Sequence, residues 1–169
     1  MHDVVIPNSA GISAFSLPPS MSSLPFINRS SWIWSAEGTH AVPPEGAGSP
    51  SHYQVRYFRR TFDLTSTDAA ALTVHLSADS RYLFYCNGAF IGRGPAKGDV
   101  NHHFYDTFDL SAHLRPGRNV LAAIVLDMSR VAHRPALLGA PCSVMTYAGG
   151  FVLEGSVMGG GGKTLANLD

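Results

Sequence analysis

The feature that most constrains the fold is a strict alternation of apolar and polar side chains in the middle of the chain. Within residues 71–79, Leu72, Val74, Leu76 and Ala78 alternate with polar side chains. Successive side chains of an extended strand point to opposite faces, so this period of two is typical of a strand with one buried face. Residues 53–64 alternate in the same way, and no window of 11 or more residues shows the period of a helix. The chain is therefore predicted to be built from strands.

Turn signals divide these strands at short intervals. Asn87 and Gly88 stand between two apolar runs, which is the strongest short signal for a hairpin, because a type I′ turn needs positive φ at both central residues. The segment 115–119 (RPGRN) predicts a further turn. The strand that follows, residues 120–126, is apolar on both faces and is expected to lie between layers. About eight short strands without intervening helices predict an all-β fold, an antiparallel β-sandwich or jelly roll with little helix.

Length and charge limit the domain organisation and the partners. The 169 residues suffice for one domain, which we place at residues 31–169, after a poorly ordered leader or linker at residues 1–30 that is rich in Ser and Pro. Twelve basic residues balance twelve acidic ones, which argues against nucleic acid as a partner. No apolar run reaches the roughly 20 residues of a membrane span. No signal peptide is visible at the N-terminus, so the compartment stays open.

Three successive segments carry a resemblance to a known family. They are YFRRTFDL at 57–64, ADSRYLFYCNGAFIGRGPAKGD at 78–99 and YDTFDLSAHLRPGRNVLAAIV at 105–125. Together they resemble the N-terminal β-sandwich modules of bacterial α-L-rhamnosidases, which are similar to galactose-binding domains. The resemblance implies a parent glycoside hydrolase that removes terminal L-rhamnose by inversion, with a C-terminal catalytic barrel in the same polypeptide. No part of this chain matches the catalytic motif, so no catalytic residue is expected here and the chain is interpreted as a fragment of a longer enzyme.

The candidate binding residues surround the hairpin and the loop after it. Sugars are recognised by planar polar groups that pair with adjacent hydroxyls and by aromatic faces that cover the ring. The side chains of this kind are Asp79, Arg81, Tyr82, Asn87, Arg93, Asp99, His103, Tyr105 and Asp106. The alternative is structural, with the carboxylates and Asn87 serving turns and the arginines holding loops through ion pairs.

No cofactor or metal is predicted for this chain. His102 and His103 are adjacent and would point to opposite faces, which disfavours zinc, whereas calcium held by Asp and carbonyl oxygens in the loop 98–109 stays an open alternative. Cys86 lies in an apolar stretch and is predicted to be a buried thiol. The predicted function is a noncatalytic module that binds carbohydrate, a rhamnose-containing glycan, or supports the barrel. A purely structural domain between neighbours and a self-contained hydrolase are the alternatives.

Overall fold

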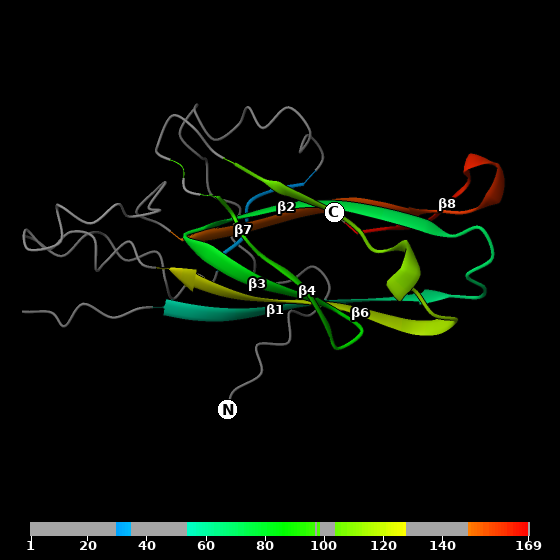
Figure 1. Cartoon of the computed structure of the whole chain (residues 1–169), viewed down its shortest axis with the longest axis horizontal. Helices are drawn as coiled ribbons and strands as arrows, with labels where there is room; N and C mark the ends of the chain where they lie inside the picture. The colour runs from blue at the N-terminus through cyan, green and yellow to red at the C-terminus, as the bar shows by residue number, and fades with distance from the viewer. Residues whose placement is uncertain (1–29, 35–53, 97, 99–103, 128–148, 169) are drawn as a thin grey trace, which may run out of the picture.

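The computed structural model describes residues 30–34, 54–96, 98, 104–127 and 149–168, and these form a two-layer antiparallel β-sandwich (Figure 1). The first sheet has the order β1-β6-β3-β4, formed by Gln54–Leu64, Gly117–Asp127, Arg81–Cys86 and Ala89–Gly94. The second has the order β5-β2-β7-β8, formed by Asp106–Asp109, Ala71–Asp79, Gly150–Met158 and Thr164–Asn167. The predicted fold class is confirmed. The predicted leader lies outside the described residues, apart from Ser30.

The core lies between the two sheets and follows the alternation of the sequence. Leu72, Val74, Leu76 and Ala78 of β2 are fully buried, and the core residues of the first sheet include Phe84, Leu121 and Val125, which are 0 to 2% exposed. Phe84 packs against Phe108 of the opposite sheet, with ring centroids 6.0 Å apart. Burial of this kind contributes about 1.5–3 kcal/mol for each large side chain, and it holds the layers together.

The turns also form where the sequence places them. Asn87 and Gly88 have φ of 51° and 86° and close the hairpin between β3 and β4. The turn at residues 115–119 leads into β6, with Gly117 at φ 80°. Strand β8 was not predicted. It follows a short glycine-rich 3-10 turn, Gly160–Gly162, and pairs with β7.

Trp32 and Trp34, two aromatic residues that an extended chain places on the same side, are both buried. Trp34 lies against Phe58, with ring centroids 6.1 Å apart, and Ile33 between the two tryptophans forms a bridge with Phe151 of β7. The tryptophans therefore belong to the core. Cys86 is also buried and free, as predicted.

Strand β6 departs from its predicted environment. It is an inner strand of the first sheet, and its residues Leu121, Ala123 and Val125 face the core. The opposite face, with Ile124 and Leu126, is only half-buried, and no further layer covers it among the described residues. Strand β6 therefore has a second apolar face that is not part of the core between the two sheets.

Candidate functional site

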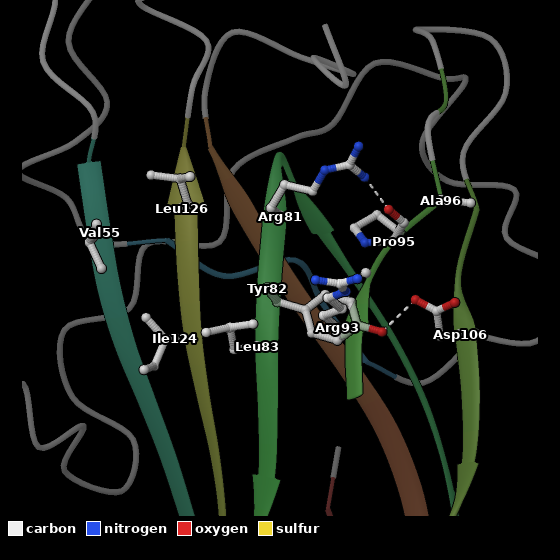
Figure 2. Close-up of a pocket in the computed structure, with 11 residues that line it drawn as sticks. Val55, Arg81, Tyr82, Leu83, Arg93, Pro95, Ala96, Asp106, Ile124 and Leu126 are labelled. Carbon is white, nitrogen blue, oxygen red and sulfur yellow. Dashed lines mark hydrogen bonds between the residues drawn. The ribbon is translucent and has the colours of Figure 1, made fainter. Parts of the chain in front are cut away.

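A groove of about 860 Å³ opens at one end of the first sheet (Figure 2). Its residues come from five strands and from the turn after β4: Val55, Arg81, Tyr82, Leu83, Arg93, Gly94, Pro95, Ala96, Asp106, Ile124 and Leu126. Figure 2 shows the apolar side chains of β1, β6 and β3 on one side and Asp106 and Pro95 on the other, with the two arginines between them. The groove thus combines an apolar wall with polar side chains.

The apolar wall follows from the pairing of the strands. Val55 lies opposite Leu126, and Ile124 lies opposite Leu83, so these side chains are cross-strand neighbours on the outer face of the first sheet. Val55 is 41% and Leu83 is 37% exposed. A ligand with an apolar surface can therefore lie on this wall and displace water from it.

Tyr82 and Asp106 form a partly buried hydrogen bond beside the groove. The Tyr82 side chain is 2% exposed, and its hydroxyl donates to Oδ2 of Asp106, 24 residues away in the sequence. Burial raises the pKa of the Tyr82 hydroxyl well above its usual value, and the hydrogen bond and the negative charge of Asp106 raise that pKa further. The hydroxyl therefore stays protonated and holds the carboxylate in place.

Gly94 makes room for this pair of side chains. A Cβ atom at position 94 would lie 1.9 Å from Oδ2 of Asp106 and 2.8 Å from the Tyr82 hydroxyl. Both distances are shorter than any ordinary carbon–oxygen contact. A residue without a side chain is therefore required where β4 passes the Tyr82–Asp106 pair.

The two arginines of the groove differ in how they are held. Arg81 is half-buried, and its guanidinium donates a hydrogen bond to the carbonyl oxygen of Pro95, which ties β3 to the turn after β4. Arg93 is exposed on β4, opposite Leu83 in the register. Among the residues that the structure describes, the Arg93 guanidinium has no hydrogen bond or ion pair. Arg81 is therefore positioned by the fold, whereas Arg93 is available to a ligand.

The structure brings together four of the nine side chains singled out in the sequence: Arg81, Tyr82, Arg93 and Asp106. Two others lie outside the groove, one at the end of β2 and one directly before β5. Asp79 is fully buried at the end of β2, opposite Gly150, and Tyr105 lies with its ring edge-on to His75. Asp99 and His103 lie outside the described residues.

Asn87 lies at the opposite end of β3 from the groove and has a structural environment. Its side-chain amide donates to the carbonyl oxygen of His113 and to Oδ1 of Asn119, both at 2.8 Å. Its own Oδ1 accepts from the backbone N–H of Val120 at 2.9 Å. These three bonds fasten the hairpin to the 3-10 helix Ser111–His113 and to the start of β6, which agrees with the structural alternative for this residue.

The apolar wall of the groove is absent from the residues predicted from the sequence, because only polar and aromatic side chains were candidates for sugar binding. The signal that could have found Ile124 and Leu126 was the second apolar face of β6. Within the described part of the chain, no three His, Cys, Asp or Glu side chains are grouped to hold a metal ion. The calcium alternative falls largely on the loop positions 99–103, which the structure does not describe. No helix among the described residues is long and apolar enough to cross a membrane.

Comparison with known proteins connects this fold to glycoside hydrolases. The chain matches no protein-family model. An α-L-rhamnosidase of Streptomyces avermitilis is 33% identical over 115 residues, which cover 68% of this chain and 10% of that protein. The chain thus spans about a tenth of the length of the curated relative that it matches.

Solved structures share the fold. The α-L-rhamnosidase of Streptomyces avermitilis complexed with L-rhamnose aligns with a TM-score of 0.53 and 24% identity, over 94% of this chain and 13% of that chain. The α-L-rhamnosidase of Dictyoglumus thermophilum aligns with a TM-score of 0.52 and 18% identity, over 68% and 12% of the two chains. A lectin from Pleurotus ostreatus in complex with GalNAc has a TM-score of 0.50 and 22% identity, over 82% and 32%. The comparisons confirm the resemblance expected from residues 57–125: this chain is similar to a β-sandwich module of α-L-rhamnosidases.

Proposed function

We propose that this chain is a noncatalytic carbohydrate-binding module of a larger glycoside hydrolase that acts on L-rhamnosides, and that sugar binds in the groove between β1 and β5. The similarity to an α-L-rhamnosidase over 68% of the chain supports the proposal that the larger enzyme acts on L-rhamnosides. The observation that carries the binding role is the groove itself, in which polar side chains from three strands stand beside an apolar wall.

The chemistry of the groove suits a sugar. A pyranose ring has an apolar face and a rim of hydroxyl groups that both donate and accept hydrogen bonds. The wall formed by Leu83, Ile124 and Leu126 suits the apolar face, and Arg81 and Asp106 are a donor and an acceptor for hydroxyls. Arg81 and Asp106 are held by Pro95 and Tyr82, so less side-chain entropy is lost when a ligand binds.

A hydrolytic role is not part of the proposal. A glycosidase needs two carboxyl groups about 5–9.5 Å apart on either side of the scissile bond. Among the described side chains that line the groove, Asp106 is the one carboxylate, and Tyr82 holds one of its oxygens. The reaction is therefore assigned to another part of the parent enzyme, which the resemblance implies to be a C-terminal barrel.

Titration of the full chain with sugars tests the binding role. L-Rhamnose, galactose and a rhamnose-containing polysaccharide are added with and without calcium, and binding is followed by calorimetry and by backbone amide NMR shifts. We expect saturable shifts at β3, β4 and β5, and weaker binding in Asp106→Ala. Saturable binding that leaves these strands unchanged, or release of free sugar, would contradict the proposal.

A structural role within the enzyme is the second candidate function, and one observation favours it. The first sheet has an outer apolar face formed by Val55, Tyr57, Leu83, Phe90, Ile124 and Leu126. On the outward face of the second sheet, Thr73, His75 and Thr107 are polar, whereas Val152 on that face is buried. A contiguous apolar face of this kind is typical of a protein interface. Absence of sugar binding by a folded chain would favour this second role, with a neighbouring domain of the same polypeptide on this face.

A further inference from the structure

We infer that the groove selects acidic sugars, hexuronic acids whose carboxylate pairs with Arg93, over their neutral counterparts. This inference rests on the proposed carbohydrate binding and names the class of sugar. It starts from Arg93, which is the exposed cation of the groove and has no hydrogen bond or ion pair within the described residues.

The carboxylate already present in the groove does not compensate Arg93. Oδ2 of Asp106 accepts the hydroxyl of Tyr82, and no ion pair links Asp106 to Arg93. Oδ2 of Asp106 also lies close against Gly94 of β4, in the space that a side chain at that position would occupy. A guanidinium is planar and matches a carboxylate with two parallel hydrogen bonds. A carboxylate supplied by the ligand is therefore the natural partner of Arg93.

The surroundings of Arg93 specify a sugar acid more closely than a simple anion. Arg93 lies opposite Leu83, and Leu83 lies opposite Ile124, so the cation and the apolar wall are neighbours on one face. Adjacent strands are about 4.8 Å apart, which places these three residues within about 10 Å of each other. One sugar residue can then lay its apolar face on Leu83 and Ile124 while its carboxylate reaches Arg93.

Asp106 distinguishes a sugar acid from an inorganic anion. Tyr82 occupies Oδ2 of Asp106, and Oδ1 has no hydrogen bond among the described residues, so it remains as an acceptor. A phosphate or sulfate ion would be repelled by the negative charge of this carboxylate. A uronic acid instead offers hydroxyl donors to Asp106 and a carboxylate to Arg93. One ligand can thus bind both the cation Arg93 and the carboxylate Asp106.

The central comparison of the test is between methyl glucuronide and methyl glucoside, which differ only in the carboxylate at C6. The full chain is titrated with methyl glucuronide, methyl glucoside, methyl rhamnoside and inorganic phosphate, and dissociation constants are taken from NMR shifts. A charge-assisted pair at an exposed position is expected to favour the glucuronide over the glucoside by about tenfold. Raising the salt concentration from about 0.05 M to about 0.5 M should reduce this preference because exposed charges are screened.

Two variants assign the preference to Arg93. Arg93→Gln should lower the affinity for glucuronide about tenfold and so remove its preference over glucoside. Arg59→Gln is the matched control, since Arg59 is exposed on the same sheet but does not line the groove. Both side chains are exposed, so both variants should keep the amide spectrum of the folded chain.

The outcomes separate the two proposals. Equal affinity for glucuronide and glucoside, or equal loss in the Arg59 variant, overturns the preference for acidic sugars and leaves carbohydrate binding intact. Phosphate binding as tight as that of glucuronide also overturns the preference, because it would make the groove a general anion site. Failure of all three glycosides to bind contradicts the proposed function itself.

Discussion

Replacement of Tyr82 by phenylalanine removes the hydrogen bond that joins the two sheets beside the groove. The Tyr82 ring is 2% exposed and remains in place, while Oδ2 of the half-buried Asp106 loses its donor. A hydrogen bond to a charged group contributes about 1.5–3 kcal/mol. Because Asp106 is partly exposed and water can replace part of the lost bond, we expect Tyr82→Phe to lower the free energy of unfolding by about 1.5 kcal/mol.

A double-mutant cycle separates this hydrogen bond from other effects of the substitutions. Tyr82→Phe, Asp106→Ala and the double variant are unfolded in urea, and the transition is followed through the fluorescence of the two buried tryptophans. Asp106→Ala should then lower the free energy of unfolding by about 1.5 kcal/mol less in the Tyr82→Phe background than in the unchanged chain. Tyr85→Phe is the control, since Tyr85 is on the outer face and its hydroxyl has no hydrogen bond among the described residues; its effect should be within about 0.5 kcal/mol. A coupling below about 0.5 kcal/mol would refute the role given to this pair.

Two further predictions concern the stability of the sandwich. Leu76→Ala, at a fully buried position of β2, should lower the free energy of unfolding by about 2–5 kcal/mol in urea titrations. Leu83→Ala, on the outer face, should lower it by under about 1 kcal/mol. Equal losses in the two variants would contradict the placement of the core. The carboxylate of Asp109 accepts hydrogen bonds from the side chain and backbone of Ser111, which hold the pKa of Asp109 below its usual value. The ionised Asp109 side chain therefore stabilises the folded chain above the unfolded pKa of about 3.9, and this stabilisation is lost as the pH falls through the lower folded pKa. Asp109→Asn lacks the titrating group, so its thermal unfolding temperature should depend less on pH between about 5 and about 2. An unchanged pH profile in that variant would count against a stabilising role of the Asp109–Ser111 hydrogen bonds.

The sequence alone determined which faces of the strands turn inward and where the chain reverses. The inward residues of β2, such as Leu72 and Leu76, follow from the alternation because side chains of an extended chain point to opposite sides at every step. The hairpin at Asn87 and Gly88 follows from the few residue types that tolerate positive φ at both positions. Both properties depend on one residue and its near neighbours, so no tertiary structure was needed to predict them.

Only the tertiary structure decided which of the candidate side chains meet. Asp79 and Arg81 are two residues apart, yet Asp79 is buried in the second sheet and Arg81 lines the groove of the first. Tyr82 and Asp106 are 24 residues apart and form one hydrogen bond, because β5 joins the opposite sheet from β3. The period of two is the same in every strand and carries no information about which strands pair. That choice depends on the burial summed over both sheets and on the loops that connect them, so the groove exists only once the whole sandwich has formed.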